Sequence, residues 1–102
     1  MQIHAIADAR RFSLREVQRQ ELVAQDGLLI ELLCFEAGQH LQGPAQTAAC
    51  VYQVLEGEAL VREGGTSKRL GKGVLATFDG GAEHTLENAG GGLLVVMRTS
   101  RV

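Results

Sequence analysis

The sequence has no tryptophan, one tyrosine, one proline and two cysteines among its 102 residues. The single proline beside 13 glycines indicates many tight turns but few rigid ones. No segment approaches the roughly 20 continuous apolar residues of a membrane helix, and the first residues lack the pattern of a secretory signal. We therefore expect a cytoplasmic protein without membrane contact, in which Cys34 and Cys50 are reduced thiols rather than a disulfide.

The sequence also lacks an excess of positive charge. Ten Lys and Arg residues stand against twelve Asp and Glu residues, a net charge of −2 with neutral histidines. A nucleic-acid binder usually shows a basic excess, so we expect no nucleic-acid partner. The hydrophobic content of 45% and charged content of 22% are ordinary for a globular protein and exclude collagen, coiled coil and a disordered tail. The length fits one domain.

All glycines lie between Gly27 and Gly92, where they form turn signals at regular intervals. Short runs rich in apolar residues lie between these turns, and no helical periodicity is visible beyond residue 25. Short strands at a spacing of roughly 8–12 residues are typical of an all-β sandwich or barrel. Alternation and glycine spacing predict strands at residues 28–36, 50–56, 58–63, 74–78 and 93–99.

The first 26 residues contain no glycine and four of the eight arginines. We interpret residues 1–26 as an N-terminal arm within the same single domain as a barrel at residues 27–102. Ser13 to Glu16 has the form of a capping box, which predicts a short helix. The stretch from Glu16 to Ala24 fits equally well a strand with outward-facing polar residues, so both alternatives stay open.

Two glycine-bounded segments in the barrel region have motif-like spacings. The first runs from Gly38 to Gly57 and matches the spacing of the motif G-x5-H-x-H-x3-E-x6-G. The second runs from Gly73 through Gly81 and His84 to Asn88 and follows the pattern G-x5-P-x-G-x2-H-x3-N, with Asp79 at the proline position. Together these segments resemble the paired motifs of the cupin superfamily, and the resemblance covers half the chain. It implies an RmlC-like jelly-roll barrel, a double-stranded β-helix.

The metal-binding positions of the superfamily are mostly replaced. The resemblance implies a divalent metal held by two histidines and a glutamate of the first motif and by the histidine of the second. Pro44, Gln46 and Cys50 stand at the first three positions, and His84 alone remains. We therefore expect a degenerate site without a tightly bound metal. Should a metal bind, zinc suits a set of His84, Cys50, Gln46 and His40 best.

Strand alternation places Cys50, Tyr52 and Val54 on one face, which lines the barrel if Cys50 takes the position of the glutamate. The same alternation places His84 and Leu86 inside. The alternative is that these side chains only fill the core, but the scarcity of aromatic residues favours a cavity. We predict a small, mostly apolar ligand pocket lined by Gln46, Cys50, Tyr52, Phe78, His84 and Met97.

Three functions remain open from the sequence. The first is binding of a small organic molecule beside His84 without a tightly bound metal. The second is a metal-dependent enzyme of the dioxygenase or isomerase type, and the third is a non-catalytic sensor or interaction barrel. We also expect a homodimer, because Val17, Leu22 and Val23 give the arm an apolar strand whose edge needs covering.

Overall fold

The computed structural model describes residues 1–43 and 48–101. These residues contain one short 3-10 turn and nine strands: η1 (Ile6–Ala9), β1 (Gln18–Gln25), β2 (Leu28–Phe35), β3 (His40–Gln42), β4 (Cys50–Glu56), β5 (Ala59–Glu63), β6 (Thr66–Leu70), β7 (Leu75–Phe78), β8 (Thr85–Asn88) and β9 (Leu94–Arg101). Within the described ranges, no helix has the length and apolar character needed to cross a membrane.

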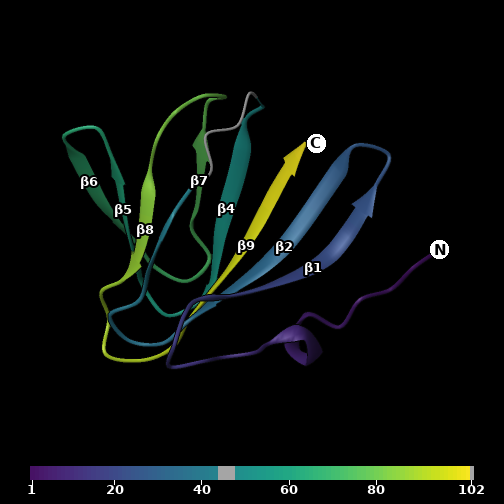
Figure 1. The fold of residues 1–102 in the computed structure, drawn as a ribbon, viewed down its shortest axis with the longest axis horizontal. Coiled ribbons are helices and arrows are strands. Elements are labelled where there is room, and N and C mark those ends of the chain that lie inside the picture. Colours follow the sequence, from purple (N-terminus) through teal and green to yellow (C-terminus); the bar gives the residue numbers. More distant parts are fainter. Residues whose placement is uncertain (44–47, 102) are drawn as a thin grey trace.

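The strands form two antiparallel sheets that face each other (Figure 1). One sheet has five strands in the order β1-β2-β9-β4-β7, and the other has four in the order β3-β8-β5-β6. The prediction of an all-β fold is confirmed. The five predicted strands correspond to β2, β4, β5, β7 and β9, with ends that differ by at most two residues.

Four strands were not predicted outright, because their sequences lack a clear apolar alternation. In β6, four of the five residues are exposed, and pairing with β5 alone defines the strand. The arm forms β1 over Gln18–Gln25, so the strand alternative is correct for this stretch. At the capping-box sequence no helix forms. The hydroxyl of Ser13 accepts a hydrogen bond from the backbone N–H of Arg15 at 3.1 Å, and residues 14–16 form a bend before β1 begins at Gln18.

Two apolar clusters lie on opposite faces of the five-stranded sheet. The inner cluster fills the space between the sheets and contains Leu33, Phe35, Tyr52, Val54, Cys50, Phe78, Leu86, Leu94 and Val96 among its buried residues. The outer cluster contains Leu32, Cys34 and Val95, which are covered by residues of the arm such as Ile6 and Phe12. Cys34 and Cys50 are both free thiols, and the sheet separates them.

The part of the arm that precedes β1 makes a charged contact with the barrel, in addition to the pairing of β1 with β2. The guanidinium of Arg10 donates to the carboxylate of Glu56 at 2.8 Å, and both side chains are partly exposed. Such pairs contribute little stability by themselves. The burial of apolar residues beneath the arm is therefore the larger contribution to its docking.

Gly57 forms the turn between β4 and β5 with a φ angle of +85°, in the left-handed region that glycine adopts without strain. A Cβ atom at this position would collide with the backbone carbonyl oxygen of Leu93, which precedes β9. Because Gly57 has no side chain, the turn between β4 and β5 can lie directly against the backbone just before β9.

We expect Gly57→Ala to lower the free energy of unfolding by about 3 kcal/mol or more, because backbone strain and a backbone collision act together. Chemical denaturation measures this loss. Gly64→Ala tests strain alone, because Gly64 has a φ of +58° and open space around it. Gly65→Ala tests neither effect and should change stability by less than about 0.5 kcal/mol. Equal losses in all three variants would contradict the argument.

Candidate functional site

His84 is buried between the sheets, one residue before β8, with 4% of its surface exposed. Its ring stacks on Phe78 at the end of β7, with ring centroids 4.0 Å apart and planes 14° apart. The Tyr52 ring meets both rings edge to face. Gly43 closes the remaining side: its N–H donates to the carbonyl of His84 at 2.8 Å, and a Cβ there would collide with the imidazole.

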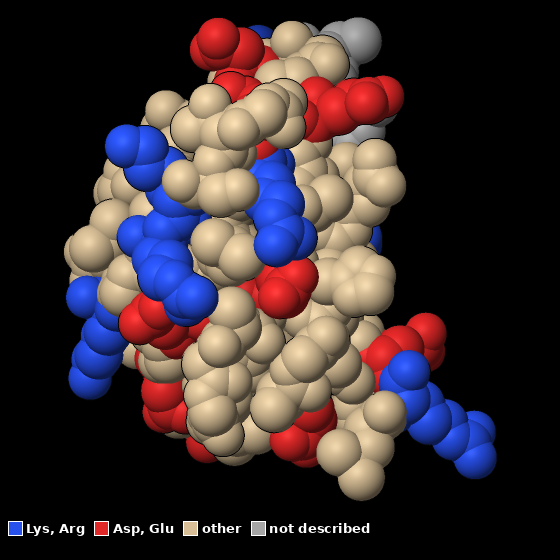
Figure 2. Space-filling view, turned by 90° about the vertical axis from the view of Figure 1, so that its left-hand side faces the viewer, with Lys and Arg blue, Asp and Glu red and all other residues tan. Residues whose placement is uncertain are grey.

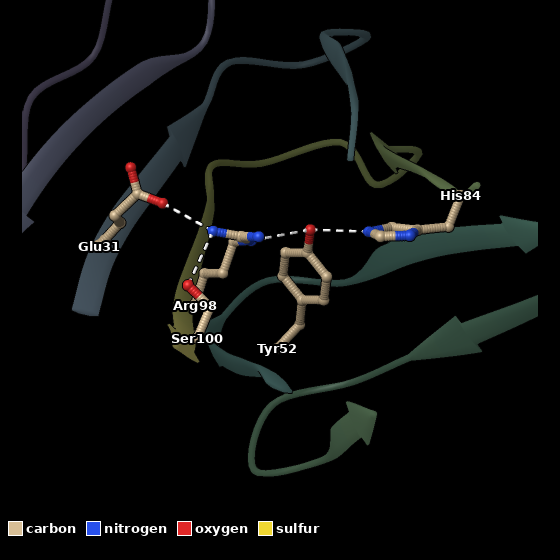
Figure 3. A network of polar contacts seen from close by, with 5 residues as sticks. All are labelled: Glu31, Tyr52, His84, Arg98 and Ser100. Atoms are coloured by element: carbon tan, nitrogen blue, oxygen red, sulfur yellow. Dashed lines mark hydrogen bonds and ion pairs between the residues drawn. The ribbon is translucent and has the colours of Figure 1, made fainter. Parts of the chain in front are cut away.

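A chain of polar contacts runs from His84 across the inner face of the five-stranded sheet (Figure 3). The Tyr52 hydroxyl lies 2.8 Å from Nε2 of His84, and Nε of Arg98 donates to the same hydroxyl at 3.2 Å. Nη1 of Arg98 donates to the Glu31 carboxylate at 3.0 Å and to the Ser100 hydroxyl at 3.2 Å. We call these five residues the polar row.

The polar row follows from strand register. Tyr52 on β4 lies opposite Arg98 on β9, and Arg98 lies opposite Glu31 on β2, so the three side chains share one face. Arg98 is 2% exposed, which makes its charge costly unless it is paired. The carboxylate of Glu31 supplies that pairing at the side of the sheet remote from His84.

The contacts of His84 define the direction of each hydrogen bond. Nδ1 lies 3.0 Å from the backbone carbonyl of Ala82, which can only accept, so Nδ1 carries a proton. In the neutral imidazole, Nε2 then accepts from the Tyr52 hydroxyl, and the hydroxyl oxygen accepts from Arg98. All three hydrogen bonds therefore point the same way: Arg98 donates to Tyr52, Tyr52 donates to His84, and His84 donates to the carbonyl of Ala82.

Burial raises the pKa of Tyr52 to about 12 from its ordinary value of 10.0, although the hydrogen bond and charge of Arg98 act in the opposite direction. Burial disfavours the charged form of Arg98, but its hydrogen bond to Tyr52 and its contact with Glu31 outweigh this effect and raise its pKa. Tyr52 is therefore a neutral donor and Arg98 a permanent cation at ordinary pH.

The described residues do not fit a divalent metal at His84. A histidine ligand commonly donates its second N–H to a backbone carbonyl, as His84 does to Ala82. The Tyr52 hydroxyl proton, however, takes the lone pair of Nε2 that a metal would need. The charge of Arg98 lies directly behind that hydroxyl and repels a cation. No group of three His, Cys, Asp or Glu side chains suited to a metal occurs within residues 1–43 and 48–101.

Four of the predicted site residues lie together. Cys50 lies opposite Phe78 across the β4–β7 pair, and both are buried in the inner cluster with Tyr52 and His84 close by. Gln46, also predicted to line the pocket and to be a metal ligand, lies outside the described residues.

Two of the predicted site residues lie elsewhere. His40 is exposed on β3, opposite Glu87 of β8 and away from the barrel interior. Met97 packs in the outer cluster under the arm, so its prediction as a pocket residue is corrected. Strand alternation explains the correction, because Leu94, Val96 and Arg98 occupy the inner face of β9 and Met97 points the other way.

A cavity of about 300 Å³ lies where β7 approaches the β5–β6 hairpin. β6 and β7 are each the outermost strand of their sheet. Apolar and polar residues alternate around the cavity, which is lined by Val61, Glu63, Thr66, Lys68, Arg69, Leu70, Ala76, Thr77 and Phe78. Phe78 thus lines the cavity and also stacks on His84, which connects the cavity to the polar row.

The outer face of the four-stranded sheet carries mixed charge. Figure 2 shows basic and acidic side chains interleaved on this side of the molecule. Arg62 of β5 pairs with Glu87 at 3.2 Å, and Arg69 of β6 pairs with Glu58 at 2.7 Å. These pairs balance the charges locally, so they form no patch of one sign.

Tyr52 should remain protonated in the folded protein at a pH where a free tyrosine has ionised. Stability from this group is present below about pH 10 and is lost as the pH rises toward about 12, because only the unfolded chain releases the proton in that window. Tyr52 is the only tyrosine and there is no tryptophan, so phenolate absorbance reports this residue alone. We expect a midpoint above 10 in the folded protein and near 10 in denaturant.

Gly43→Ala provides a specific test of the same titration. The added methyl group displaces the His84 ring, which deprives the Tyr52 hydroxyl of its acceptor and should lower the midpoint. Gly71→Ala is the matched control, because a Cβ there meets open space. A midpoint near 10 in the wild-type protein, with the circular dichroism of the folded state retained, would contradict a buried Tyr52 donor.

Solved structures similar to this chain share one architecture. A protein of Thermus thermophilus matches 99% of this chain with 97% of its own at a TM-score of 0.92 and 22% identity. A Klebsiella pneumoniae protein described as having a double-stranded β-helix domain matches 99% of this chain with 90% of its own, at 0.90 and 19% identity. An RmlC-like cupin of Desulfovibrio desulfuricans matches 99% with 96% of its own, at 0.86 and 20% identity.

Neither a protein-family model nor a curated protein matches the sequence. The structural likeness extends over nearly the whole chain, from the arm to β9, and includes both sheets. At these identities it establishes the arrangement of the strands rather than an activity. The chain therefore has the double-stranded β-helix fold of the cupin superfamily.

Proposed function

We propose that this cupin-fold protein binds a small organic molecule in the barrel beside His84, without a tightly bound metal. The observation that carries the proposal is a cavity with Phe78 in its lining; among the described residues Cys50, Tyr52 and His84 do not line it, and the Phe78 ring lies between it and the imidazole of His84. The cavity volume of about 300 Å³ is at the lower end of the range of ligand pockets, and the cavity floor is apolar. Such a site holds about ten non-hydrogen atoms, since a water molecule occupies about 30 Å³.

Phe78 supports a coupling between the cavity and His84. One face of its ring is occupied by the imidazole at a centroid distance of 4.0 Å, and the ring also forms part of the cavity wall. A ligand that contacts Phe78 therefore acts on a residue packed directly against the polar row. Because Tyr52 touches both Phe78 and His84, its environment changes with occupancy.

The polar row supports binding without a metal. Both ring nitrogens of His84 already have hydrogen-bond partners, the Ala82 carbonyl and the Tyr52 hydroxyl. A metal ion that bound Nε2 would have to break a buried hydrogen bond. Arg98 adds a repulsive charge at that position. The metal-dependent enzyme is thus the less favoured alternative.

Ala76→Leu should abolish binding, because Ala76 of β7 lines the cavity and a larger side chain fills it. Benzyl alcohol, a neutral probe of suitable size, should shift the NMR signals of Phe78, His84 and Val61 in the wild-type protein. The same shifts are expected after treatment with a chelator. Ala37→Leu, at an exposed turn position between β2 and β3, is the matched control and should leave the shifts unchanged. Shifts that survive in Ala76→Leu would overturn the proposed cavity.

We also propose a homodimer that pairs through β1. The outer edges of β6 and β7 border the cavity, which leaves eight-residue β1 as the long edge strand at the other side of its sheet (Figure 1). Leu22 packs in the outer cluster and Val17 against the inner one, so the backbone edge rather than these side chains supports pairing. Light scattering should give twice the chain mass of 10.9 kDa at high micromolar concentration. The mass of a single chain would exclude the dimer.

A further inference from the structure

We propose that the ligand of the β5–β6–β7 cavity is an amphipathic molecule whose single carboxylate pairs with Lys68. This inference rests on the proposed function, since it names the chemical class that the same cavity takes. Two observations carry it. The cross-strand pairs of the β5–β6 hairpin change from apolar to polar toward the turn, and Arg69 of the lining is in an ion pair, whereas none is found for Lys68 among the described residues.

The cavity changes from apolar to polar along the hairpin. Cross-strand pairs on its inner face run from the apolar end to the turn in the order Ala59↔Leu70, Val61↔Lys68 and Glu63↔Thr66. Ala59 and Val61 are buried, whereas Glu63 and Thr66 are exposed. An amphipathic ligand fits this gradient with its apolar body toward Leu70 and Phe78 and its polar end toward the turn.

Lys68 is the cation that stands at the boundary of the gradient. It lies opposite Val61, which is 6% exposed, and is itself exposed, a setting in which the methylene stem of a lysine covers apolar surface while its ammonium stays in water. The other lining cation, Arg69, is held by Glu58 at 2.7 Å. No ion pair of Lys68 occurs within the described part of the chain. Its charge is therefore available to a ligand.

The lining carboxylate of Glu63 does not compensate for this charge. It forms no ion pair with Lys68 among the described residues, and it lies at the last pair before the turn, where water solvates it. A ligand carboxylate placed against Lys68 would be partly desolvated by the apolar floor, which strengthens the pair relative to a fully exposed one. Apart from the paired Arg69, the lining carries one charge of each sign, so position rather than net charge favours an anion: Lys68 lies opposite the buried Val61, whereas Glu63 lies at the exposed end of the hairpin.

The test compares three ligands of one shape, benzoate, benzamide and benzylamine, in NMR titrations of the folded protein. Benzoate should bind about fivefold more tightly than benzamide, the effect of one partly exposed ion pair, and benzylamine should bind most weakly. Lys68→Met keeps the length of the side chain but removes its charge, and it should abolish the preference for benzoate. Lys72→Met, a lysine that does not line the cavity, should retain it.

The outcomes separate this inference from the proposed function. Equal binding of benzoate and benzamide, or a preference that persists in Lys68→Met, would overturn the role of Lys68 while the cavity remains a binding site. Tightest binding of benzylamine, lost in Glu63→Gln, would assign the opposite ligand charge and overturn it as well. Absence of shifts at Val61 and Phe78 with all three ligands and with benzyl alcohol would defeat the proposed function itself.

Discussion

The hydroxyl of Tyr52 joins a buried cation to a buried imidazole, and the interior of the barrel is organised around this atom. It accepts from Arg98 at 3.2 Å and donates to His84 at 2.8 Å. Without it, one nitrogen of each residue would lose this buried partner, each at a cost of about 1–3 kcal/mol. The apolar packing around Phe78 and the ion pair to Glu31 keep the phenol in place, so burial and hydrogen bonding reinforce each other.

In this arrangement, buried polar atoms of His84, Tyr52 and Arg98 have hydrogen-bond partners within the protein itself. The hydroxyl proton of Tyr52 is donated to the lone pair of His84 that a metal ion would use. The positive charge of Arg98 lies behind that hydroxyl and would repel a metal cation. The carbonyl of Ala82 orients the imidazole in either situation. The imidazole of His84 is thereby hydrogen-bonded on both nitrogens by protein groups, and Phe78, which stacks on it, also lines the neighbouring cavity.

The sequence predicted those parts of the fold that depend on apolar alternation and on glycine. The anchoring glycines, among them Gly38, Gly57, Gly73 and Gly81, all have φ angles of 79–85°. Strand β6 escaped prediction because its exposed residues carry no periodic signal. In the site, hydrophobicity alone favours Met97 over Arg98 as the interior residue of β9, whereas the structure places Met97 in the outer cluster and Arg98 on the inner face. The alternation that starts at Leu94 and Val96 places Arg98 on the inner face. A buried arginine is expected there only once its partners Glu31 and Tyr52, which come from other strands, are known.

The central place of β9 between β2 and β4 governs when the molecule can form. Residues 28–35 and 50–56 do not pair with each other, and both depend on residues 94–101 to become one sheet. During synthesis the growing chain can close local hairpins such as β1–β2 and β5–β6, but the five-stranded sheet waits for its last strand. Arg98 lies on β9, so its buried charge enters the interior only when this strand completes the sheet.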